Sequence, residues 1–481
     1  MSNTTQALSR IEAILDDSSF VEIGAAVTAR ATDFNMQEKK APSDGVITGY
    51  GVVNGNLVYV YSQDAAVLGG TIGEMHAKKI ASLYEKAMKM GAPVIGLIDC
   101  AGLRLQEATD ALNGFGEIYK NMSLASGIIP QITAVYGECG GGLAVLAELS
   151  DFVFVEEKKA KLFVNSPNAL DGNYESKLDT SSAKFMAEAG VADFVGDEET
   201  IANGVRQLVS MLPSNNTEGT VCTDNQDDLN RVCADMAAEI ADPAPALTDI
   251  SDDGVFVETK AEYAKEMVTG FILVDGVTVG AVANRTALYD ENGEKAEEFA
   301  PVLTTAGAYK AAEFVTFCNA FEIPVLTLTN IKGFEATVKS ERTIAKASAK
   351  LVYAFANADV PKVNVITGEA YGSAYVAMNS KSIGADMVYA WPQASIGMMD
   401  ASSAAKIMYA DDIAASKDAA ATINEKAAEY AALQSSVDQA AARGYVDTII
   451  NPEDTRKYVI AAFEMLFDKR EVRADKKHGT V

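Results

Sequence analysis

Two short runs of small residues mark where this chain could do chemistry. Residues 139–144 read CGGGLA and residues 370–375 read AYGSAY; each run follows a strand-like apolar segment and precedes an apolar helical one. Small residues at a strand-to-helix turn leave backbone N–H groups uncovered, and the helix dipole adds positive potential there. The two turns therefore predict sites that hold a phosphate or an oxyanion on backbone donors.

Side chains that usually act as acid, base or nucleophile are scarce. The chain has two histidines, His76 and His478, and the second lies in a charged terminal tail. GxSxG, HExxH and P-loop motifs are missing, and no GxGxxG follows a strand. His76 follows LGGTIGEM, and we expect it to have a structural or helix-capping role. Such an enzyme would orient its ligands and stabilise developing negative charge, which suits enolate chemistry on a thioester.

The composition excludes several classes of partner. Among 481 residues, 67 are acidic and 40 are basic, which gives a net charge of -27. Nucleic acids and anionic membranes would be repelled by this charge. No apolar stretch approaches the roughly 18 residues of a membrane span, so direct membrane insertion is not expected. The five cysteines show no CxxC pairing, which predicts neither disulfides nor a metal site and favours the cytoplasm.

The sequence repeats itself with a nearly constant spacing. TGYGVVNGNLVYV from Thr48 returns as TGFILVDGVTVGAV from Thr269, at a spacing of 269 − 48 = 221. A second spacing, 324 − 93 = 231, then relates four features: Pro93 to Pro324, Gly102 to Gly333, Pro130 to Pro361, and Gly137-Glu138 to Gly368-Glu369. Each half thus predicts hairpin, helix, buried strand, glycine loop, helix, strand and glycine loop, which is an α/β arrangement of stacked ββα units.

The join between the halves is predicted in a polar stretch rich in Asp, Asn and Pro. We place two domains at residues 1–235 and 236–481. The alanine-rich stretch 401–443 predicts helices that either pack on a neighbouring subunit or remain solvated.

Residues 87–90 read AMKM, the letters that surround the biotinylated lysine of biotin carrier proteins. A carrier lysine needs the tip of a β-hairpin, whereas the apolar residues from Ile80 to Met88 follow a helical period that stops at Gly91. We therefore expect Lys89 to lie at the end of an ordinary amphipathic helix and not to carry biotin.

The chain resembles the carboxyltransferase subunits of biotin-dependent acyl-CoA carboxylases and decarboxylases, of the propionyl-CoA carboxylase β and methylmalonyl-CoA decarboxylase α type. The main motifs are IIPQITAVYGECGGGLAVLAELSDFVFV and ADVPKVNVITGEAYGSAYVAMNSKSIGADMVYAWPQASIGMMD. Also similar are RIEAILDDSSFVEIG, GAPVIGLIDCAGLRLQE and DDGVFVETKAEYAKEMVTGF, so the resemblance covers nearly the whole chain. It implies two tandem crotonase-like domains of the ClpP/crotonase ββα superhelix type.

The resemblance also implies how the parts work together. The first domain would bind acyl-CoA, and the second would bind carboxybiotin presented by a separate biotin carboxyl carrier protein. A biotin carboxylase subunit or a membrane decarboxylase subunit would be the further partner. The subunits would form a homohexamer, a trimer of dimers, with each active site between the first domain of one subunit and the second domain of another.

Site residues follow from the same resemblance. Gly141, Gly142 and Leu143 would face the thioester oxygen, and Gly372, Ser373 and Ala374 the ureido oxygen of biotin. Carboxybiotin would lose CO₂, its ureido nitrogen would take the α-proton of the acyl-CoA, and the carbanion would attack CO₂. Further ligand-lining positions are expected at Gly69, Gly70, Gly102, Leu103, Gly333, Phe334, Tyr371 and Val376.

Two departures from the family pattern bear on specificity. Asn330-Ile331-Lys332 stands where Asp-x-Pro is usual, and EATVKSERT replaces the following Pro-Gly-Thr stretch. Val376 replaces an aspartate that often bears on acyl preference.

Four functions follow as hypotheses. The first is carboxyl transfer from carboxybiotin to a short acyl-CoA of the propionyl or acetyl type. The second is the reverse transfer, in a decarboxylase for methylmalonyl-, malonyl- or glutaconyl-CoA. The third is a biotin-independent crotonase-type hydratase or isomerase, for which Glu107, Glu117 and Glu138 are candidate carboxylates. The fourth is a non-catalytic scaffold that binds CoA.

Overall fold

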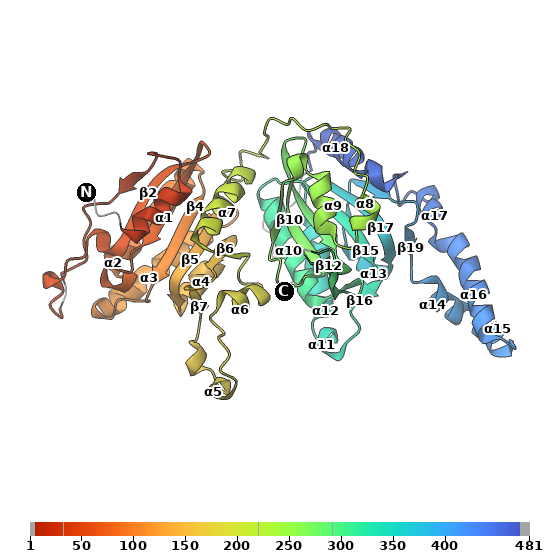
Figure 1. The fold of residues 1–481 in the computed structure, drawn as a ribbon, viewed down its shortest axis with the longest axis horizontal. Helices are drawn as coiled ribbons and strands as arrows, with labels where there is room; N and C mark the ends of the chain where they lie inside the picture. The colour runs from red at the N-terminus through yellow and green to blue at the C-terminus, as the bar shows by residue number, and fades with distance from the viewer. Residues whose placement is uncertain (1–4, 32, 220, 291, 472–481) are drawn as a thin grey trace. The chain divides into compact units, whose positions relative to one another are not determined.

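The structure is a computed structural model that describes residues 5–31, 33–219, 221–290 and 292–471. The chain divides into two compact units (Figure 1). The first runs to Gly219 and also includes Lys260–Tyr263, and the second contains the rest of the chain. This division falls earlier than the boundary near residue 235 that the composition suggests.

The first unit is built on an eight-stranded sheet in the order β1-β2-β3-β4-β5-β6-β8, with β7 paired to β5. Its strands are β1 (Val21–Ile23), β2 (Val46–Val53), β3 (Asn56–Gln63), β4 (Val94–Cys100), β5 (Gln131–Gly140), β6 (Phe152–Glu156), β7 (Lys161–Phe163) and β8 (Phe194–Gly196). Its helices are α1 (Gln6–Ile14), α2 (Glu74–Met90), α3 (Ala108–Ala125), α4 (Gly142–Glu148), α5 (Asn173–Ser176), α6 (Ala183–Glu188) and α7 (Glu198–Met211). From β3 onward the neighbouring strands run parallel, as ββα units require.

The second unit repeats this plan with the order β20-β18-β17-β15-β11-β10-β9, and β19 paired to β17. Its strands are β9 (Phe256–Thr259), β10 (Met267–Val274), β11 (Val277–Asn284), β12 (Ala287–Tyr289), β13 (Lys295–Glu298), β14 (Val302–Leu303), β15 (Val325–Ile331), β16 (Gly333–Phe334), β17 (Lys362–Tyr371), β18 (Met387–Ala390), β19 (Ser395–Gly397) and β20 (Thr448–Ile449). Its helices are α8 (Met236–Glu239), α9 (Pro243–Ile250), α10 (Thr305–Ala320), α11 (Val338–Glu341), α12 (Ile344–Asn357), α13 (Gly372–Ala377), α14 (Ala401–Met408), α15 (Ala410–Ala415), α16 (Ala419–Tyr430), α17 (Val437–Ala442) and α18 (Thr455–Leu466).

The predicted α/β fold and the internal repeat are confirmed strand by strand. The hairpins β2-β3 and β10-β11 keep the same register, in which Val46 pairs with Gln63 and Met267 with Asn284. Even an irregularity recurs, since the register shifts between Ile98 and Cys100 in one half and between Thr329 and Ile331 in the other. The two halves therefore present equivalent strand ends, where each of the predicted turns begins.

Helix α2 contains the AMKM letters at residues 87–90. It runs to Met90 and ends at Gly91, whose left-handed φ of 62° is typical of a glycine cap. Ile80, Leu83 and Tyr84 of α2 are buried in the core of the first unit, whereas Lys89 is exposed. The prediction of an amphipathic helix at this position is confirmed.

In each unit, an arginine on the last helix, α7 or α18, is hydrogen-bonded to the end of an earlier helix of that unit, α1 or α9, and to an aspartate just after it. Arg206 of α7 donates to the Ile14 carbonyl at 2.6 Å and to Asp16 at 2.8 Å. Arg456 of α18 donates to the Ile250 carbonyl at 2.5 Å and to Asp252 at 2.7 Å. Asp16 in turn accepts from the turn of the β2-β3 hairpin, and Asp252 from the turn of the β10-β11 hairpin.

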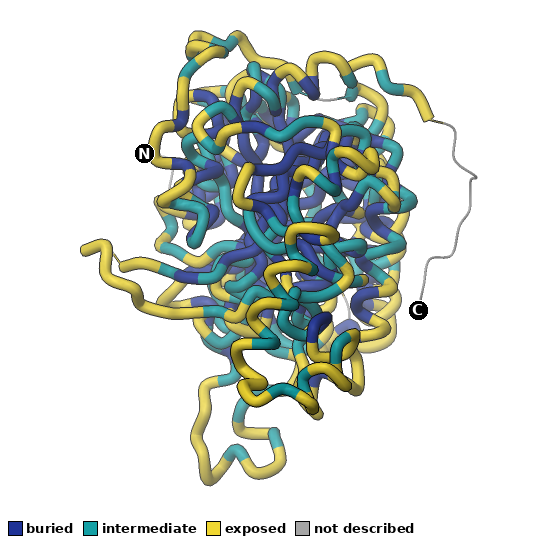
Figure 2. Tube along the Cα trace, turned by 90° about the vertical axis from the view of Figure 1, so that its right-hand side faces the viewer, coloured by how far each residue is buried: buried dark blue, intermediate teal, exposed yellow. Residues whose placement is uncertain are grey.

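Figure 2 shows buried residues along the inner segments of the trace and exposed residues along the outer loops. In the second unit, helices α15 and α16 have no buried residue, and Ile407 and Met408 at the end of α14 are 67% and 61% exposed. The predicted alanine-rich helices are therefore present and lie at the surface of this chain.

Candidate functional site

The first predicted turn lies between β5 and α4. Gly141 has a φ of 65°, and its N–H donates to the Phe163 carbonyl at 2.8 Å. Within the described part of the chain, the N–H groups of Gly142 and Leu143 donate to no acceptor. The Leu143 side chain is fully buried and anchors α4 in the core, while Gly142 is exposed. The turn thus holds two adjacent backbone donors that have no acceptor among the described residues.

The other predicted site residues of the first half lie on two segments that are hydrogen-bonded to each other. The turn Leu68–Gly70 and the loop after β4 are joined by bonds from Ala101 N to Gly69 O at 3.0 Å and from Ile72 N to Gly102 O at 2.9 Å. Leu103 forms a parallel bridge with Ile72. A Cβ on Gly70 would lie 2.3 Å from the Asp99 carbonyl, so only glycine fits there. The structure therefore brings Gly69, Gly70, Gly102 and Leu103 together.

A buried ionic cluster supports this pair of segments. Arg104 pairs with Asp44 and with Glu107, the latter at 2.8 Å, and all three side chains are almost fully buried. Burial raises the pKa of Asp44, and the Arg104 guanidinium opposes that rise. Glu107 also accepts from the first N–H of α2, that of Glu74, at 2.7 Å. Glu107 is thus committed to a structural cluster, which weakens the case for it as one of the paired carboxylates of a hydratase.

His76 is part of the same buried region and has both ring nitrogens satisfied. Its Nδ1 lies 2.9 Å from the Asp44 carbonyl, and its Nε2 lies 3.2 Å from Gln63 Nε2. These partners fit a neutral ring that donates from Nδ1 and accepts at Nε2. Burial lowers the pKa of His76 to about 3. His76 is therefore a structural residue in this arrangement, while His478 lies outside the described residues.

The pKa of His76 predicts a pH-dependent stability. Between about pH 6.5 and pH 3 the unfolded chain binds a proton at this residue and the folded chain does not, so stability rises with pH across that window. Relative to His76→Gln, the free energy of unfolding should fall below pH 6.5 by up to about 1.4 kcal/mol per pH unit. Urea unfolding followed by circular dichroism at several pH values measures this. Parallel pH profiles for the two proteins would contradict a buried neutral histidine.

The second predicted turn lies between β17 and α13. Gly372 has a φ of 63°, Ser373 is exposed and Ala374 is fully buried. In the described residues, the N–H groups of Ser373 and Ala374 have no acceptor. Tyr371 is only 6% exposed, and burial raises its pKa. The carbonyl of Val376 accepts from Ser380 Oγ at 3.0 Å.

The loop that carries Gly333 and Phe334 is fixed by three contacts. Lys332 N donates to the Pro301 carbonyl at 2.7 Å, and Glu335 N donates to the Leu303 carbonyl at 3.0 Å. The Lys332 ammonium lies 3.1 Å from the Glu369 carboxylate, which joins the loop to the end of β17. The unusual lysine in this loop therefore has a partner next to the second turn.

Asn330 takes the place that Asp99 has in the first half. A Cβ on Gly137 would lie 2.1 Å from Asp99 Oδ1, and a Cβ on Gly368 would lie 2.6 Å from Asn330 Oδ1, so each side chain lies over a glycine. The Asp99 carboxylate pairs with Arg10 at 3.0 Å. Asn330 instead accepts from a backbone N–H, that of Glu369, at 3.0 Å, a bond that an uncharged amide can make. The departure at position 330 thus fits its surroundings.

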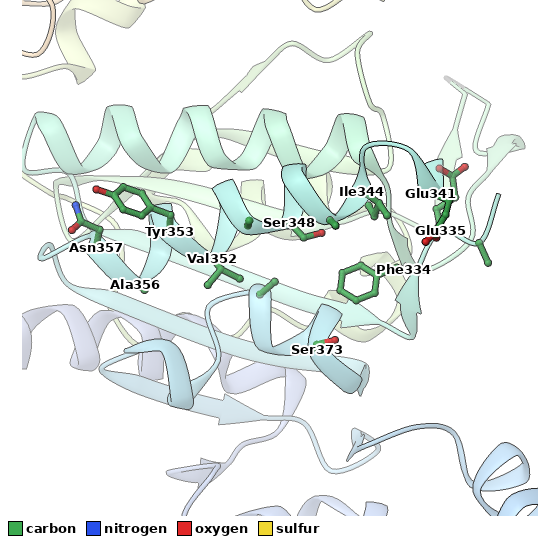
Figure 3. A pocket seen from close by; sticks show the side chains of 14 residues that line it. Phe334, Glu335, Glu341, Ile344, Ser348, Val352, Tyr353, Ala356, Asn357 and Ser373 are labelled. Carbon is green, nitrogen blue, oxygen red and sulfur yellow. The ribbon is translucent and has the colours of Figure 1, made fainter. Parts of the chain in front are cut away.

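A pocket of about 850 Å³ lies beside the second turn, between α12 and α13 (Figure 3). Two of the predicted residues, Phe334 and Ser373, line it. Most of its wall comes from one face of α12, and its lining comprises Phe334, Glu335, Ala336, Glu341, Ile344, Ala345, Ser348, Ala349, Val352, Tyr353, Ala356, Asn357, Ser373 and Ala377. The repeat predicts a helix at the place of α12, but none of the α12 residues was predicted to belong to the site, although small residues spaced three and four apart in AKASAKLVYAFAN were a usable signal.

In the ranges that the structure describes, no group of three or more His, Cys, Asp or Glu residues is arranged to hold a metal ion. Within the same ranges, no helix combines the length and apolar character needed to span a bilayer.

Comparisons with known proteins identify the family of the chain. The family model "Carboxyl transferase domain" matches residues 2–481. The chain is 39% identical to the methylmalonyl-CoA decarboxylase α subunit of Propionigenium modestum, covering 99% of this chain and 92% of that one. It is 38% identical to the propionyl-CoA carboxylase β chain of Roseobacter denitrificans, covering 99% of this chain and 93% of that one.

A solved structure confirms the expected fold. A transcarboxylase 12S structure, described as a hexamer with hydrolysed methylmalonyl-CoA bound, superposes with a TM-score of 0.91 at 35% identity. The match covers 98% of this chain and 92% of that one. The chain therefore belongs to the carboxyl transferase domain family, the family of the propionyl-CoA carboxylase β chains and methylmalonyl-CoA decarboxylase α subunits.

Proposed function

We propose that this enzyme moves a carboxyl group between biotin on a separate carrier protein and the α-carbon of a short acyl-CoA, with propionyl-CoA and methylmalonyl-CoA as the exchanging pair. One observation carries the proposal: each half has the same strand-to-helix turn with two adjacent N–H groups that have no acceptor among the described residues, at Gly142 and Leu143 and at Ser373 and Ala374. Two oxyanion sites on one scaffold suit a reaction in which negative charge develops on an oxygen of each substrate.

Each of the two turns would bind one of the two substrates. We assign the N–H groups of Gly142 and Leu143 to the thioester oxygen, which they would hold, and those of Ser373 and Ala374 to the ureido oxygen of biotin. Biotin, when bound, would supply the carboxyl group or accept it. Its ureido nitrogen would take the α-proton in carboxylation and return it in the reverse reaction. The chain's own residues hold the two oxygens at fixed positions and stabilise the charge that develops on them. His76 is buried and neutral, so it takes no part in proton transfer.

The direction of transfer follows from the partner complex and not from the turns. Donors that stabilise an enolate serve both directions equally, because the forward and reverse reactions share one transition state. Relatives of nearly equal identity are named for carboxylation and for decarboxylation. A biotin carboxylase subunit or a membrane decarboxylase subunit would decide the direction, and a cytoplasmic location suits either partner.

Assembly would complete the site. We propose a homohexamer in which the first half of one subunit faces the second half of another, because the 12S relative is described as a hexamer. Each half expressed alone should then be inactive. Sedimentation velocity with activity measured across a dilution series tests this, and a fully active monomer would contradict it.

A substrate panel separates the proposed function from its alternatives. The chain is incubated with propionyl- and acetyl-CoA, each with and without carboxybiotin, and with methylmalonyl-, malonyl- and glutaconyl-CoA, each with and without biotin, and the products are separated by chromatography. The proposal predicts turnover that requires biotin. Hydration or isomerisation without biotin would favour the crotonase-type alternative, and CoA binding without any turnover would favour a scaffold.

A further inference from the structure

The side chain of Tyr119 contacts the turn of the first unit from helix α3. Its hydroxyl donates to the Gly142 carbonyl at 2.5 Å. That carbonyl and the N–H of Leu143 belong to one peptide group, the one that joins residues 142 and 143. The Leu143 N–H has no acceptor among the described residues, and the proposed function assigns it to the thioester oxygen. Tyr119 therefore binds the oxygen end of a peptide group whose nitrogen end is a proposed oxyanion donor.

The planar peptide group transmits the effect of this bond from one end to the other. In a trans peptide the C=O and N–H bonds lie in one plane and point in opposite directions, so a contact that fixes the oxygen also fixes the direction of the N–H. A hydrogen bond to the carbonyl oxygen also polarises the group, which makes its N–H a stronger donor. Both effects favour an oxyanion that forms on the side of the peptide away from Tyr119.

Packing holds the Tyr119 ring in the position that this bond requires. The rings of Phe115 and Tyr119 lie edge to face with centroids 5.0 Å apart, and Phe115 is only 6% exposed. A Cβ on Gly142 would lie 2.9 Å from both Phe115 Cε1 and the Tyr119 oxygen, so the two rings come this close because residue 142 is a glycine. Burial raises the pKa of Tyr119, so its hydroxyl keeps its proton and remains a donor.

Helix α12 of the second unit has no hydroxyl at the equivalent position. At a spacing of 344 − 111 = 233, every buried residue of α3 from Ala111 to Met122 corresponds to a buried residue of α12. The same spacing, 352 − 119 = 233, places Val352 where α3 has Tyr119. Because a valine side chain cannot donate a hydrogen bond, this contact is specific to the turn of the first unit. That turn is the one proposed to hold the thioester oxygen, on which the enolate charge develops.

We propose that Tyr119 is a positioning residue of the carboxyl transfer: its hydroxyl orients and polarises the peptide group between Gly142 and Leu143, so that the Leu143 N–H stabilises the enolate oxygen of the acyl-CoA. Phe115 fixes the ring that carries this hydroxyl. The inference rests on the proposed function, because the oxyanion is the one that the transfer would form at the turn of the first unit.

Tyr119→Phe tests the hydroxyl, because it keeps the ring beside Phe115. We expect kcat for carboxyl transfer to fall by about three- to tenfold, which is less than the loss of a whole oxyanion donor because the N–H itself remains. The dissociation constant for propionyl-CoA, measured by calorimetry, should stay within about twofold of the wild type. The reason is that the charge stabilised by this N–H develops in the transition state and not in the bound substrate.

The carbonyl band of the bound thioester reports on the donor directly. Propionyl-CoA labelled with ¹³C in its thioester carbonyl is added without biotin, so that no transfer occurs, and infrared difference spectra record its C=O stretching band. Hydrogen-bond donors polarise this carbonyl and move the band to lower wavenumber than in free propionyl-CoA. We expect a smaller displacement in Tyr119→Phe than in the wild type. A tyrosine that serves only the fold would leave the band of the folded variant in its wild-type position.

Ser123→Ala is the matched control on the same helix. Ser123 is exposed on α3, and its hydroxyl also donates to a backbone carbonyl, that of Tyr119, at 2.8 Å. Removal of this hydroxyl should change neither kcat nor the carbonyl band, because its acceptor is not part of the turn. Circular dichroism of both variants and the wild type checks that all three are folded.

The outcomes separate this inference from the function on which it rests. A folded Tyr119→Phe variant with the wild-type kcat and the wild-type band would overturn the inference, even if the wild type transfers carboxyl groups to biotin. A slower variant with an unchanged band would also overturn it, because the hydroxyl would then not act through this peptide group. A thioester band that depends on Tyr119 in a chain that transfers no carboxyl group would overturn the proposed function and leave the effect of Tyr119 on the donor standing.

Discussion

Gly142→Pro should slow carboxyl transfer by about 10²- to 10³-fold, the usual effect of removing one oxyanion donor. The substitution deletes the N–H that the turn between β5 and α4 holds exposed. Proline is tolerated in the first turn of a helix, and Gly142 is the first residue of α4, so the backbone can accommodate it. Initial rates with saturating biotin and acyl-CoA measure the effect.

The added carbons of proline need their own control, because a Cβ at position 142 lies 2.9 Å from Phe115 Cε1. Gly142→Ala brings the same Cβ but keeps the N–H. We expect the alanine variant to retain much more activity than the proline variant, and the ratio of the two rates isolates the donor. Equal rates for the two folded variants would mean that this N–H does not stabilise the transition state.

Arg456→Ala should destabilise the second unit by about 3–5 kcal/mol, because it leaves the buried Asp252 carboxylate without its partner. The two side chains are 0% and 3% exposed, and their atoms are 2.7 Å apart. Trp391, the single tryptophan of the chain, is buried in the same unit and donates to Thr455 at 3.0 Å, so its fluorescence reports unfolding at this place.

Arg206→Ala is the matched control. Arg206 makes the equivalent contact in the first unit, but its side chain and that of Asp16 are 25% and 30% exposed, so water screens the pair. Circular dichroism in urea follows both units, and the free energy of unfolding should fall clearly for Arg456→Ala and by less than about 1 kcal/mol for Arg206→Ala. Similar small decreases for both variants would show that burial does not distinguish the two arginine contacts.

Local sequence patterns were sufficient to predict the two strand-to-helix turns and the internal repeat. Glycines and small residues after apolar strands located Gly142 and Ser373, because a strand-to-helix turn has a strong local signal. The constant spacings located equivalent strands, which the structure confirms to the level of register. The end of α2 at Gly91 was also local information, since a left-handed cap favours glycine.

Features that depend on distant residues could not be predicted in this way. The Arg456–Asp252 contact joins residues that are 204 positions apart, and no periodicity in either segment predicts this contact. Helical periodicity did not identify the pocket, because it tells which residues are buried but not how much space the facing helix leaves. Only the structure shows that the Tyr119 hydroxyl reaches the Gly142 carbonyl and that Ser348 and Val352 line the pocket.

Transfer of a labelled carboxyl group tests the central claim most directly. Methylmalonyl-CoA labelled with ¹³C in its free carboxyl group is incubated with the full chain and biotin, and the products are followed by NMR. Our account predicts that the label appears on the ureido nitrogen of biotin while propionyl-CoA accumulates in equal amount. Consumption of methylmalonyl-CoA at the same rate without biotin, or binding of both compounds with no transfer of label, would contradict it.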